Sequence, residues 1–202
     1  MYTRDDLPTA AFAAAQIFYA SGISQGISTT AADAVFAAID IARRNGVKVA
    51  YDTNYRPRLW PPARAAAMMH AAMAQADYAL PGIEDVQTLT GLTDPDAMLD
   101  FYLRLGPKVV VLKMGESGAY LATPQRCVRI PRHVVPVVDA TGAGDAFCGS
   151  FLARILAGDA PDHAARYANV AAALKCTGYG AVAPIPRPAD IRAAMEGSAG
   201  HV

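Results

Sequence analysis

The sequence predicts an α/β fold with a doubly wound, mostly parallel sheet flanked by helices. Short apolar runs of strand length alternate along the chain with longer segments of helical periodicity. Several of these runs are apolar at consecutive positions, as strands of a parallel sheet covered on both faces are. No linker or internal repeat divides the 202 residues. We therefore expect a single α/β domain over residues 1–202.

The first half of the chain alternates strands and helices from about residue 17 onwards. Ser28 to Thr30 offer caps for a helix, and apolar residues then recur at helical spacing until Asn45-Gly46 ends it. Pro61-Pro62 opens another helix, and Pro81-Gly82 closes the third strand. The expected strands cover residues 17–20, 47–51 and 78–80, and the expected helices cover residues 30–44, 61–75, 83–90 and 95–104.

The second half contains the clearest buried strand, the apolar run Val109–Leu112. Gly115 and Gly118 bracket a turn, and two hairpin strands are expected after it. The β-branched run Val134–Val138 then leads into a glycine turn and a long helix. The remaining expected strands cover residues 119–122 and 127–130, and the remaining helices cover about 142–157, 160–176 and 189–196.

Composition excludes several classes of function. Eighteen basic residues balance eighteen acidic ones, so no basic surface for nucleic acid is expected. The three cysteines suit no disulfide framework, and the four histidines have no zinc-site spacing. No uninterrupted apolar stretch is long enough to span a membrane, and the first residues do not resemble a signal peptide. We expect a cytoplasmic protein with small-molecule ligands, without nucleic acid or membrane partners.

The segment Asp139-Ala-Thr-Gly-Ala-Gly-Asp-Ala-Phe147 carries the strongest chemical signal. Gly142, Ala143 and Gly144 open a helix, where backbone N–H groups lack acceptors and favour phosphate or a developing oxyanion. Asp145 lies at the same positive helix end and is placed to accept a hydroxyl proton. The next glycine comes too late for a dinucleotide fingerprint, and no Lys-Ser/Thr follows as in a Walker A loop. A plain glycine turn with an acidic helix start is the alternative.

This segment resembles the C-terminal signature of the ribokinase-like, phosphofructokinase-B family of carbohydrate kinases. The resemblance implies ATP-dependent phosphorylation of a sugar hydroxyl. It implies that the amides of Gly142, Ala143 and Gly144 form an anion hole. It also implies that Asp145 binds the sugar hydroxyl and is the catalytic base.

Two further segments resemble the nucleotide side of the same family. Leu112–Ala119 is similar to its nucleotide-side strand and turn, and the helix around Asn169 with the following Gly180-Ala181 is similar to its adenine-pocket loop. The nucleotide-binding residues that the resemblance implies are Lys113, Gly115, Gly118, Gly142, Gly144, Asn169 and Gly180. Without this resemblance, the glycines would be an ordinary hairpin turn and Asn169 an ordinary helix residue.

The segment Asp52–Trp60 is similar to that of 2-keto-3-deoxygluconate kinases within the family. A strand that ends at Asp52 delivers Asn54 and Arg56 to the ligand edge of the sheet. The planar guanidinium of Arg56 suits the carboxylate of a sugar acid. The resemblance therefore implies phosphorylation of 2-keto-3-deoxygluconate to its 6-phosphate. Surface arginines beside a proline turn are the alternative for Arg56 and, more strongly, for Arg58.

The family's magnesium motif, Asn-x-x-Glu, is altered in this chain. Gly82 stands at its first position and Asp85 at its last, with Glu84 beside it. We expect Asp85 to act on Mg²⁺ through water and phosphate at a slightly longer reach. An acidic first turn of a helix is the alternative. The resemblance also allows a monovalent cation as a cofactor and a homo-oligomer as the assembly.

Relative to the family, the chain resembles the C-terminal two-thirds, without the opening strands, the β lid and an early glycine pair. We expect residues 1–202 alone to associate through an unpaired strand and to turn over slowly. Two hypotheses remain from the residues: a sugar kinase, or a non-catalytic nucleotide- or anion-binding remnant of one. Gly22-Ile-Ser-Gln-Gly26 also matches the hydrolase nucleophile elbow, but too little chain precedes it to supply an oxyanion-hole loop.

Overall fold

The computed structural model describes residues 2–198, and its contacts divide the chain into two compact units. The first unit contains the residues up to Lys113 together with Ala122–Cys127. The second contains Met114–Leu121 and the residues from Val128 onwards. The single domain expected over residues 1–202 stays a prediction.

The strands form the expected sheet, which is parallel over its first four members. Ser21 lies opposite Asp52 on the neighbouring strand, and Tyr51 lies opposite Ala79, so the strands end near one edge. The α/β prediction is confirmed. The six strands follow chain order in the sheet: β1 (Ile17–Ser21), β2 (Lys48–Asp52), β3 (Tyr78–Ala79), β4 (Val109–Lys113), β5 (Ala119–Thr123) and β6 (Arg126–Ile130).

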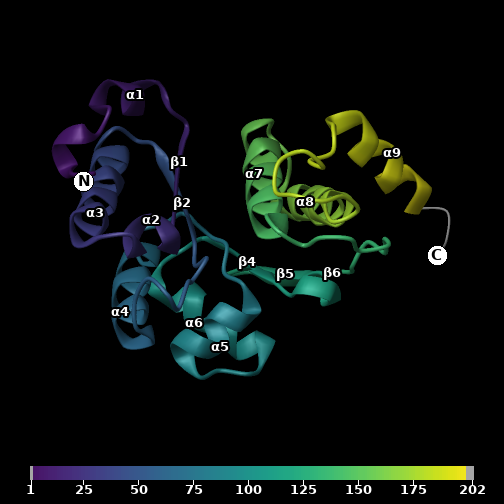
Figure 1. Cartoon of the computed structure of the whole chain (residues 1–202), viewed down its shortest axis with the longest axis horizontal. Coiled ribbons are helices and arrows are strands. Elements are labelled where there is room, and N and C mark those ends of the chain that lie inside the picture. Colours follow the sequence, from purple (N-terminus) through teal and green to yellow (C-terminus); the bar gives the residue numbers. More distant parts are fainter. Residues whose placement is uncertain (1, 199–202) are drawn as a thin grey trace. The chain divides into compact units, whose positions relative to one another are not determined.

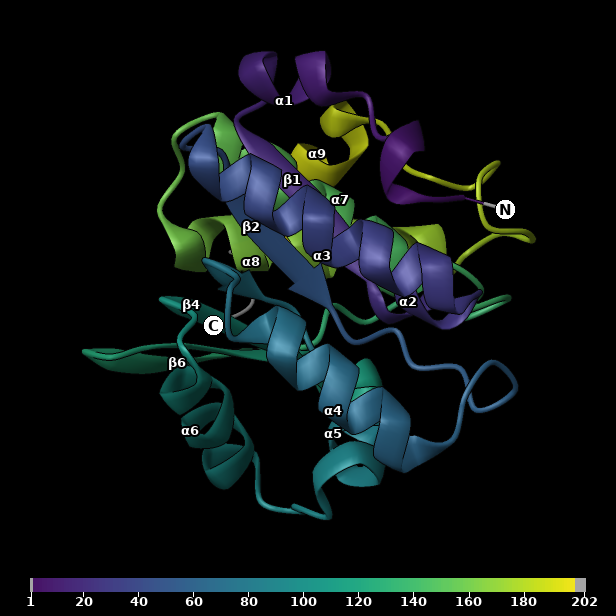
Figure 2. The same cartoon turned by 90° about the vertical axis from the view of Figure 1, so that its left-hand side faces the viewer.

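Helices pack on the strands of the first unit. Helix α3 packs on β1 and β2, and α6 packs on β4. Figures 1 and 2 show α3 running alongside these two strands. The helical elements of this unit are η1 (Arg4–Asp6), α1 (Thr9–Ala14), α2 (Gly22–Gly26), α3 (Thr29–Arg44), α4 (Pro62–Met73), α5 (Ile83–Thr90) and α6 (Pro95–Leu105).

The bounds of α3 follow from its sequence. The Ser28 hydroxyl accepts a hydrogen bond of 3.0 Å from the Ala31 amide and caps the first turn. Gly46 follows the last turn with a φ of 72°, a conformation that costs glycine little. The buried side of the helix carries a stripe of small and branched apolar residues at helical spacing: Ala31, Val35, Ala38, Ile39 and Ala42.

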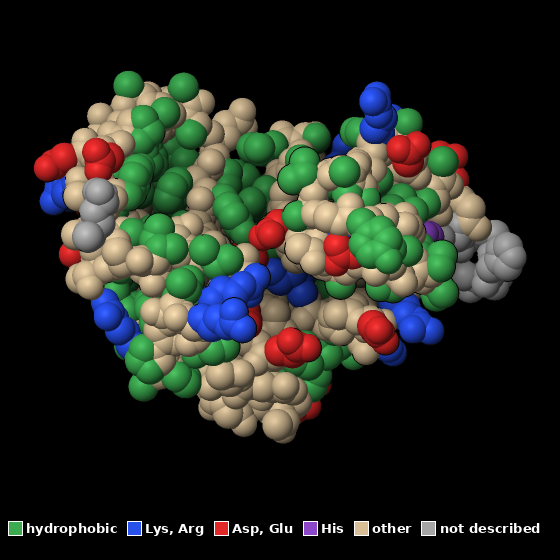
Figure 3. Space-filling model, in the orientation of Figure 1, with side chains coloured by type: hydrophobic (Ala, Val, Ile, Leu, Met, Phe, Trp, Pro, Cys, Tyr) green, Lys and Arg blue, Asp and Glu red, His purple; other side chains and the backbone are tan. Residues whose placement is uncertain are grey.

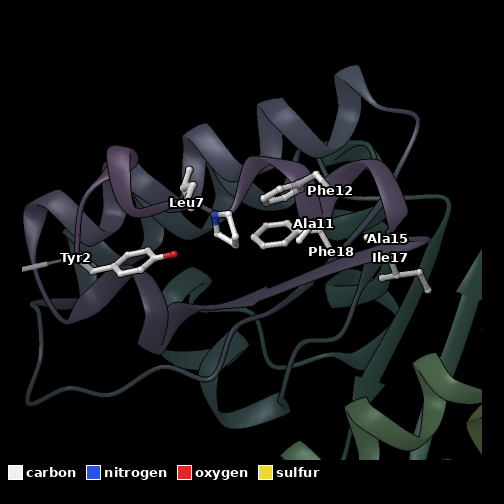
Figure 4. Close-up of a pocket in the computed structure, with 8 residues that line it drawn as sticks. Tyr2, Leu7, Ala11, Phe12, Ala15, Ile17 and Phe18 are labelled. Atoms are coloured by element: carbon white, nitrogen blue, oxygen red, sulfur yellow. The ribbon is translucent and has the colours of Figure 1, made fainter.

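The N-terminal segment before β1 is helical, which the sequence pattern did not predict. Its apolar side chains and those of β1 line an open pocket of about 270 Å³ (Figure 4). The rings of Phe12 and Phe18, which belong to this lining, lie 5.4 Å apart. Figure 3 shows hydrophobic side chains gathered over α1 and β1. Tyr19 of β1 is 38% exposed.

The segment Gly22–Gly26 forms α2 directly after β1. Ser24 therefore lies inside a helix and not at the sharp strand-to-helix turn that a nucleophile elbow requires. A Cβ atom on Gly22 would lie 2.1 Å from the Thr53 carbonyl oxygen, so close packing explains this glycine.

The second unit is mainly helical and contains α7 (Ala143–Leu156), α8 (Pro161–Lys175), α9 (Pro188–Ser198) and the short η2 (Gly115–Ser117). Helix α8 packs on both α7 and α9, as Figure 1 shows. Arg154 makes two hydrogen bonds of 2.7 Å to Asp159, and His163 Nδ1 lies 2.7 Å from the same carboxylate. This cluster joins the end of α7 to the start of α8.

The run Val134–Val138 forms neither a strand nor a helix, and Val137 and Val138 are largely exposed. The segment is instead held by backbone hydrogen bonds from Val138 and Asp139 to the Cys176 carbonyl. Within residues 2–198, no helix is long and apolar enough to cross a membrane.

Candidate active site

The glycine turn predicted at residues 142–144 is the start of α7. Gly142 is the N-cap with a φ of 78°, and a Cβ atom there would lie 3.1 Å from the Ala181 Cβ. Both observations favour glycine at this position. The Ala146 amide donates to the Gly142 carbonyl at 2.9 Å and closes the first helical turn. The amides of Gly144 and Asp145 belong to the group that an α-helix leaves without an intrahelical acceptor.

Asp145 lies in the first turn of α7 and is exposed. A carboxylate at this position interacts favourably with the positive end of the helix dipole. The same turn therefore brings a proton acceptor and a set of anion-binding amides within a few residues of each other. The roles expected for Gly142, Ala143, Gly144 and Asp145 remain predictions. The Ala143 amide differs from the expectation in that it already donates to the Ala140 carbonyl at 3.0 Å.

Asp139 fixes the backbone just before the glycine turn. One carboxylate oxygen accepts from the Thr141 amide at 2.8 Å, and the other accepts from the Gly180 amide at 2.8 Å. Hydrogen bonds from the Thr141 hydroxyl and amide and from Gly180 lower the pKa of Asp139 to about 2. Gly180, expected at the nucleotide, is thus tied to the glycine turn that begins α7. Sequence reasoning did not single out Asp139, although an aspartate two residues before Thr-Gly is a signal for such a turn.

The other nucleotide-side residues of the second unit have structural roles as well. The Asn169 amide on α8 donates to the Pro131 carbonyl at 2.9 Å. Gly118 has a φ of 90°, and a Cβ atom there would lie 2.2 Å from the Ile130 carbonyl oxygen. Gly115 has a φ of 55° in open space. Their contacts with a nucleotide remain predictions.

In the first unit, the end of β2 gathers charged side chains. Asp52, the last residue of β2, is buried, and its carboxylate lies 2.8 Å from the Lys113 ammonium at the end of β4. The Tyr19 hydroxyl donates to the same carboxylate at 3.3 Å. Sequence reasoning expected Lys113 at the nucleotide and did not single out Asp52, although an acid that ends a buried strand is a signal for the ligand edge of a sheet.

Asn54 and Arg56 follow Asp52 in the loop after β2. Asn54 has a φ of 32°, and its backbone N–H donates to the Asp52 carboxylate at 3.3 Å. The exposed Arg56 side chain donates from Nη1 to the Tyr55 carbonyl at 2.9 Å. The loop therefore carries the predicted substrate residues at the carboxyl end of a parallel strand, where ligands of such sheets bind.

Asp85 is held against this loop from the first turn of α5. Its Oδ2 accepts from the Thr53 hydroxyl at 2.7 Å and from the Tyr55 amide at 3.1 Å. Burial raises the pKa of Asp85, and these two hydrogen bonds oppose the rise. The contacts leave Oδ1 without a hydrogen bond among the described residues, so this oxygen suits a metal-bound water. Glu84 precedes it on the same helix.

A direct protein cage for a metal is not found within residues 2–198, since they contain no group of three His, Cys, Asp or Glu that could hold an ion. The chemistry of the donors instead suits Mg²⁺ bound through phosphates and water, with Asp85 as an outer partner. Among the predicted site residues, Asn54, Arg56, Asp85 and Lys113 belong to the first unit, and the turn at residues 139–145 and Gly180 belong to the second.

Comparison with known proteins agrees with these features. Residues 2–188 match the model of the pfkB family carbohydrate kinases. The chain is 31% identical over 193 residues to the 2-dehydro-3-deoxygluconokinase of Bacillus subtilis, covering 91% of this chain and 57% of the relative. It is 34% identical over 190 residues to that of Thermoproteus tenax, covering 92% and 57%. The chain therefore spans less than three-fifths of the length of these curated relatives.

The fold is similar to that of solved kinases as well. A putative ribokinase II from E. coli, in complex with ATP and Mg²⁺, has a TM-score of 0.88 and 26% identity, covering 96% of this chain and 63% of that one. The family match includes the glycine turn, Asp145 and the end of β2. The chain belongs to the pfkB family of carbohydrate kinases.

Proposed function

We propose that the chain takes part in ATP-dependent phosphorylation of a sugar-acid hydroxyl, with 2-keto-3-deoxygluconate converted to its 6-phosphate. The observation that carries the proposal is the start of α7, where Gly142 adopts a left-handed conformation and Asp145 lies in the first helical turn. Relatives named 2-dehydro-3-deoxygluconokinase support the choice of substrate.

In the proposed reaction, ATP supplies the phosphoryl group, and the protein supplies position and charge. Asp145 accepts the proton of the substrate hydroxyl as its oxygen bonds to the γ-phosphorus. The bond from phosphorus to the bridging oxygen breaks, and ADP leaves. The amides of Gly142, Ala143 and Gly144 donate hydrogen bonds to the transferring phosphoryl group. Because the backbone already holds them in place, they stabilise its negative charge without a rearrangement of the site.

The remaining residues bind and orient the substrate, the nucleotide and the metal ion. Arg56 provides the guanidinium for the substrate carboxylate, and Asn54 donates to its hydroxyls. Lys113, Gly115, Gly118, Asn169 and Gly180 are the proposed nucleotide-side residues. Asp85 would hold Mg²⁺ through water, and the ion would neutralise charge on the phosphates of ATP. A monovalent cation is a further proposed cofactor. We also propose a cytoplasmic location, in keeping with three free cysteines, and a homo-oligomer that associates at the sheet edge formed by β1.

The test is an ADP-release assay on the purified chain with ATP, Mg²⁺ and a panel of sugars. We expect release with 2-keto-3-deoxygluconate and little with neutral ribose or fructose. Preference for a neutral sugar would contradict the substrate assignment. ADP binding by calorimetry without turnover on any sugar would favour the non-catalytic remnant.

A further inference from the structure

The last residue of α8, Lys175, is a buried ammonium that the proposed reaction does not use. Its side chain is 0% exposed, and it is the only fully buried lysine among residues 2–198. It stands on the buried side of α8, four residues after Ala171 and seven after Ala168, where the helix is otherwise apolar. Burying a charged group costs free energy unless other groups compensate the charge, so the presence of a lysine at this buried position requires an explanation.

The contact of Lys175 is specific. Its Nζ donates a hydrogen bond of 2.8 Å to the backbone carbonyl of Asp139. An ammonium has three N–H groups, and this carbonyl is its only hydrogen-bond acceptor in the part of the chain that the structure describes. The carboxylate of the same aspartate accepts from Thr141 and Gly180. Both the main chain and the side chain of Asp139 are therefore held.

The Asp139 carbonyl lies three residues before the N-cap of α7. The next carbonyl, that of Ala140, accepts from the Ala143 amide at 3.0 Å, and Gly142 then turns the chain into the helix. Any shift of the Asp139 peptide is carried directly into the amides proposed to bind the phosphoryl group. Lys175 thus fixes the carbonyl of Asp139, and the backbone hydrogen bonds of the following residues connect this peptide to the amides at the start of α7.

The loop after Lys175 holds the same turn at further points. The Cys176 carbonyl accepts from the amides of Val138 and Asp139 at 2.8 and 3.1 Å. Ala181 packs closely against Gly142, since a Cβ atom at residue 142 would lie only 3.1 Å from the Ala181 Cβ. The segment from Lys175 to Ala181 is therefore a clamp on residues 138–142, and Lys175 is its charged member.

We propose that Lys175 is a positioning residue for phosphoryl transfer. Its fixed positive charge holds the Asp139 peptide so that the Gly142–Gly144 amides point at the transferring group. The inference rests on the proposed function for its effect on rate, but its effect on the turn is independent of the substrate. A merely structural lysine would stabilise the fold without changing the properties of these amides.

The test compares Lys175→Met, which keeps the length of the side chain and removes its charge, with Lys108→Met, an exposed lysine of the first unit. For Lys175→Met we expect kcat to fall about 100-fold, the cost of a small misplacement of catalytic groups, with little change in the KM of the sugar acid. Hydrogen exchange of the Ala143 and Ala146 amides, which donate to the Ala140 and Gly142 carbonyls in this turn, should become faster when followed by NMR. Lys108→Met should change neither quantity.

A second variant covers the case in which Lys175→Met does not fold. Lys175→Ala leaves space for a small amine, and added methylammonium should restore a large part of kcat and of the amide protection. Folded Lys175→Met with unchanged kcat, or Lys175→Ala that gains stability but no rate from methylammonium, would overturn the inference. If the wild-type chain proves inactive on every sugar, the proposed function fails. Unchanged exchange of the Ala143 and Ala146 amides in the lysine variants would then separately overturn the role of Lys175.

Discussion

The ammonium of Lys113 lies 2.8 Å from the carboxylate of Asp52, and the two residues end strands β4 and β2, with β3 between them. The side chains are only 15% and 1% exposed. Removing one partner of a buried ion pair leaves the other charge without compensation. We therefore predict that Asp52→Asn lowers the free energy of unfolding by about 3 kcal/mol.

Urea unfolding checks this value, and Asp100→Asn is the matched control. Asp100 pairs with Arg104 on the surface of α6, where the side chains are 65% and 82% exposed. The control should change stability by less than about 1 kcal/mol, as exposed ion pairs do. Equal effects of the two substitutions would contradict the assignment of Asp52 as a buried anchor of the strand ends.

Arg56 is predicted to bind the carboxylate of the substrate through its planar guanidinium. Arg56→Lys keeps the charge but loses the fork, so we expect the KM of the sugar acid to rise about tenfold, the equivalent of one charge-assisted hydrogen bond. Steady-state kinetics on the chain check this. Arg58→Lys, two residues later on the exposed loop, should leave KM unchanged. A larger effect at Arg58 would transfer the substrate role to that residue.

The lowered pKa of Asp139 predicts a pH dependence of stability. Its pKa is about 2 in the folded chain and about 3.9 in an unfolded one, so the ionised form favours folding. The stabilisation is present above about pH 4 and is lost as the pH falls towards 2. Asp139→Asn should therefore make the thermal midpoint of unfolding depend less steeply on pH across this range. Asp33 is an exposed residue of α3, and Asp33→Asn should keep the wild-type dependence of the midpoint on pH. If Asp139→Asn also kept that dependence, the prediction would be refuted.

Gly118 is predicted to be required by packing, in contrast to Gly115. A Cβ atom at Gly118 would meet the Ile130 carbonyl at 2.2 Å, whereas nothing lies within 4 Å of one at Gly115. Gly118→Ala should destabilise the chain by about 3 kcal/mol, from strain and overlap together. Gly115→Ala should cost only about 1 kcal/mol of left-handed strain. Chemical unfolding of both variants distinguishes these values, and equal losses would count against the close approach.

The regular elements could be predicted where the pattern is long. Helix α3 spans 16 residues, Thr29–Arg44, close to the expected range 30–44. The helix after the glycine turn was expected because glycine and an acidic first turn mark a helix start. Helices α1 and α2 were missed because they are short, and α2 begins and ends with glycine. Such segments are too short for a helical repeat of apolar residues to be recognised.

The sequence predicted a candidate site of glycines and polar residues, but it did not single out Asp52, Asp139 or Lys175. Gly142 and Asp145 stand in a recognisable run of sequence. Asp52, Asp139 and Lys175 act through partners that are distant in the chain: Lys175 bonds to a residue 36 positions earlier. Only the fold brings these pairs together, so no local pattern announces them.

The most direct measurement of the central claim is turnover by Asp145→Asn beside Asp96→Asn, an exposed aspartate in the first turn of α6. Loss of a general base should lower kcat at least about 100-fold, while ADP still binds because the amides of α7 remain. Asp96→Asn should match the wild-type chain in both. A fall in kcat of less than about tenfold in Asp145→Asn, which is below the range for a general base, would contradict the role of Asp145 in the reaction.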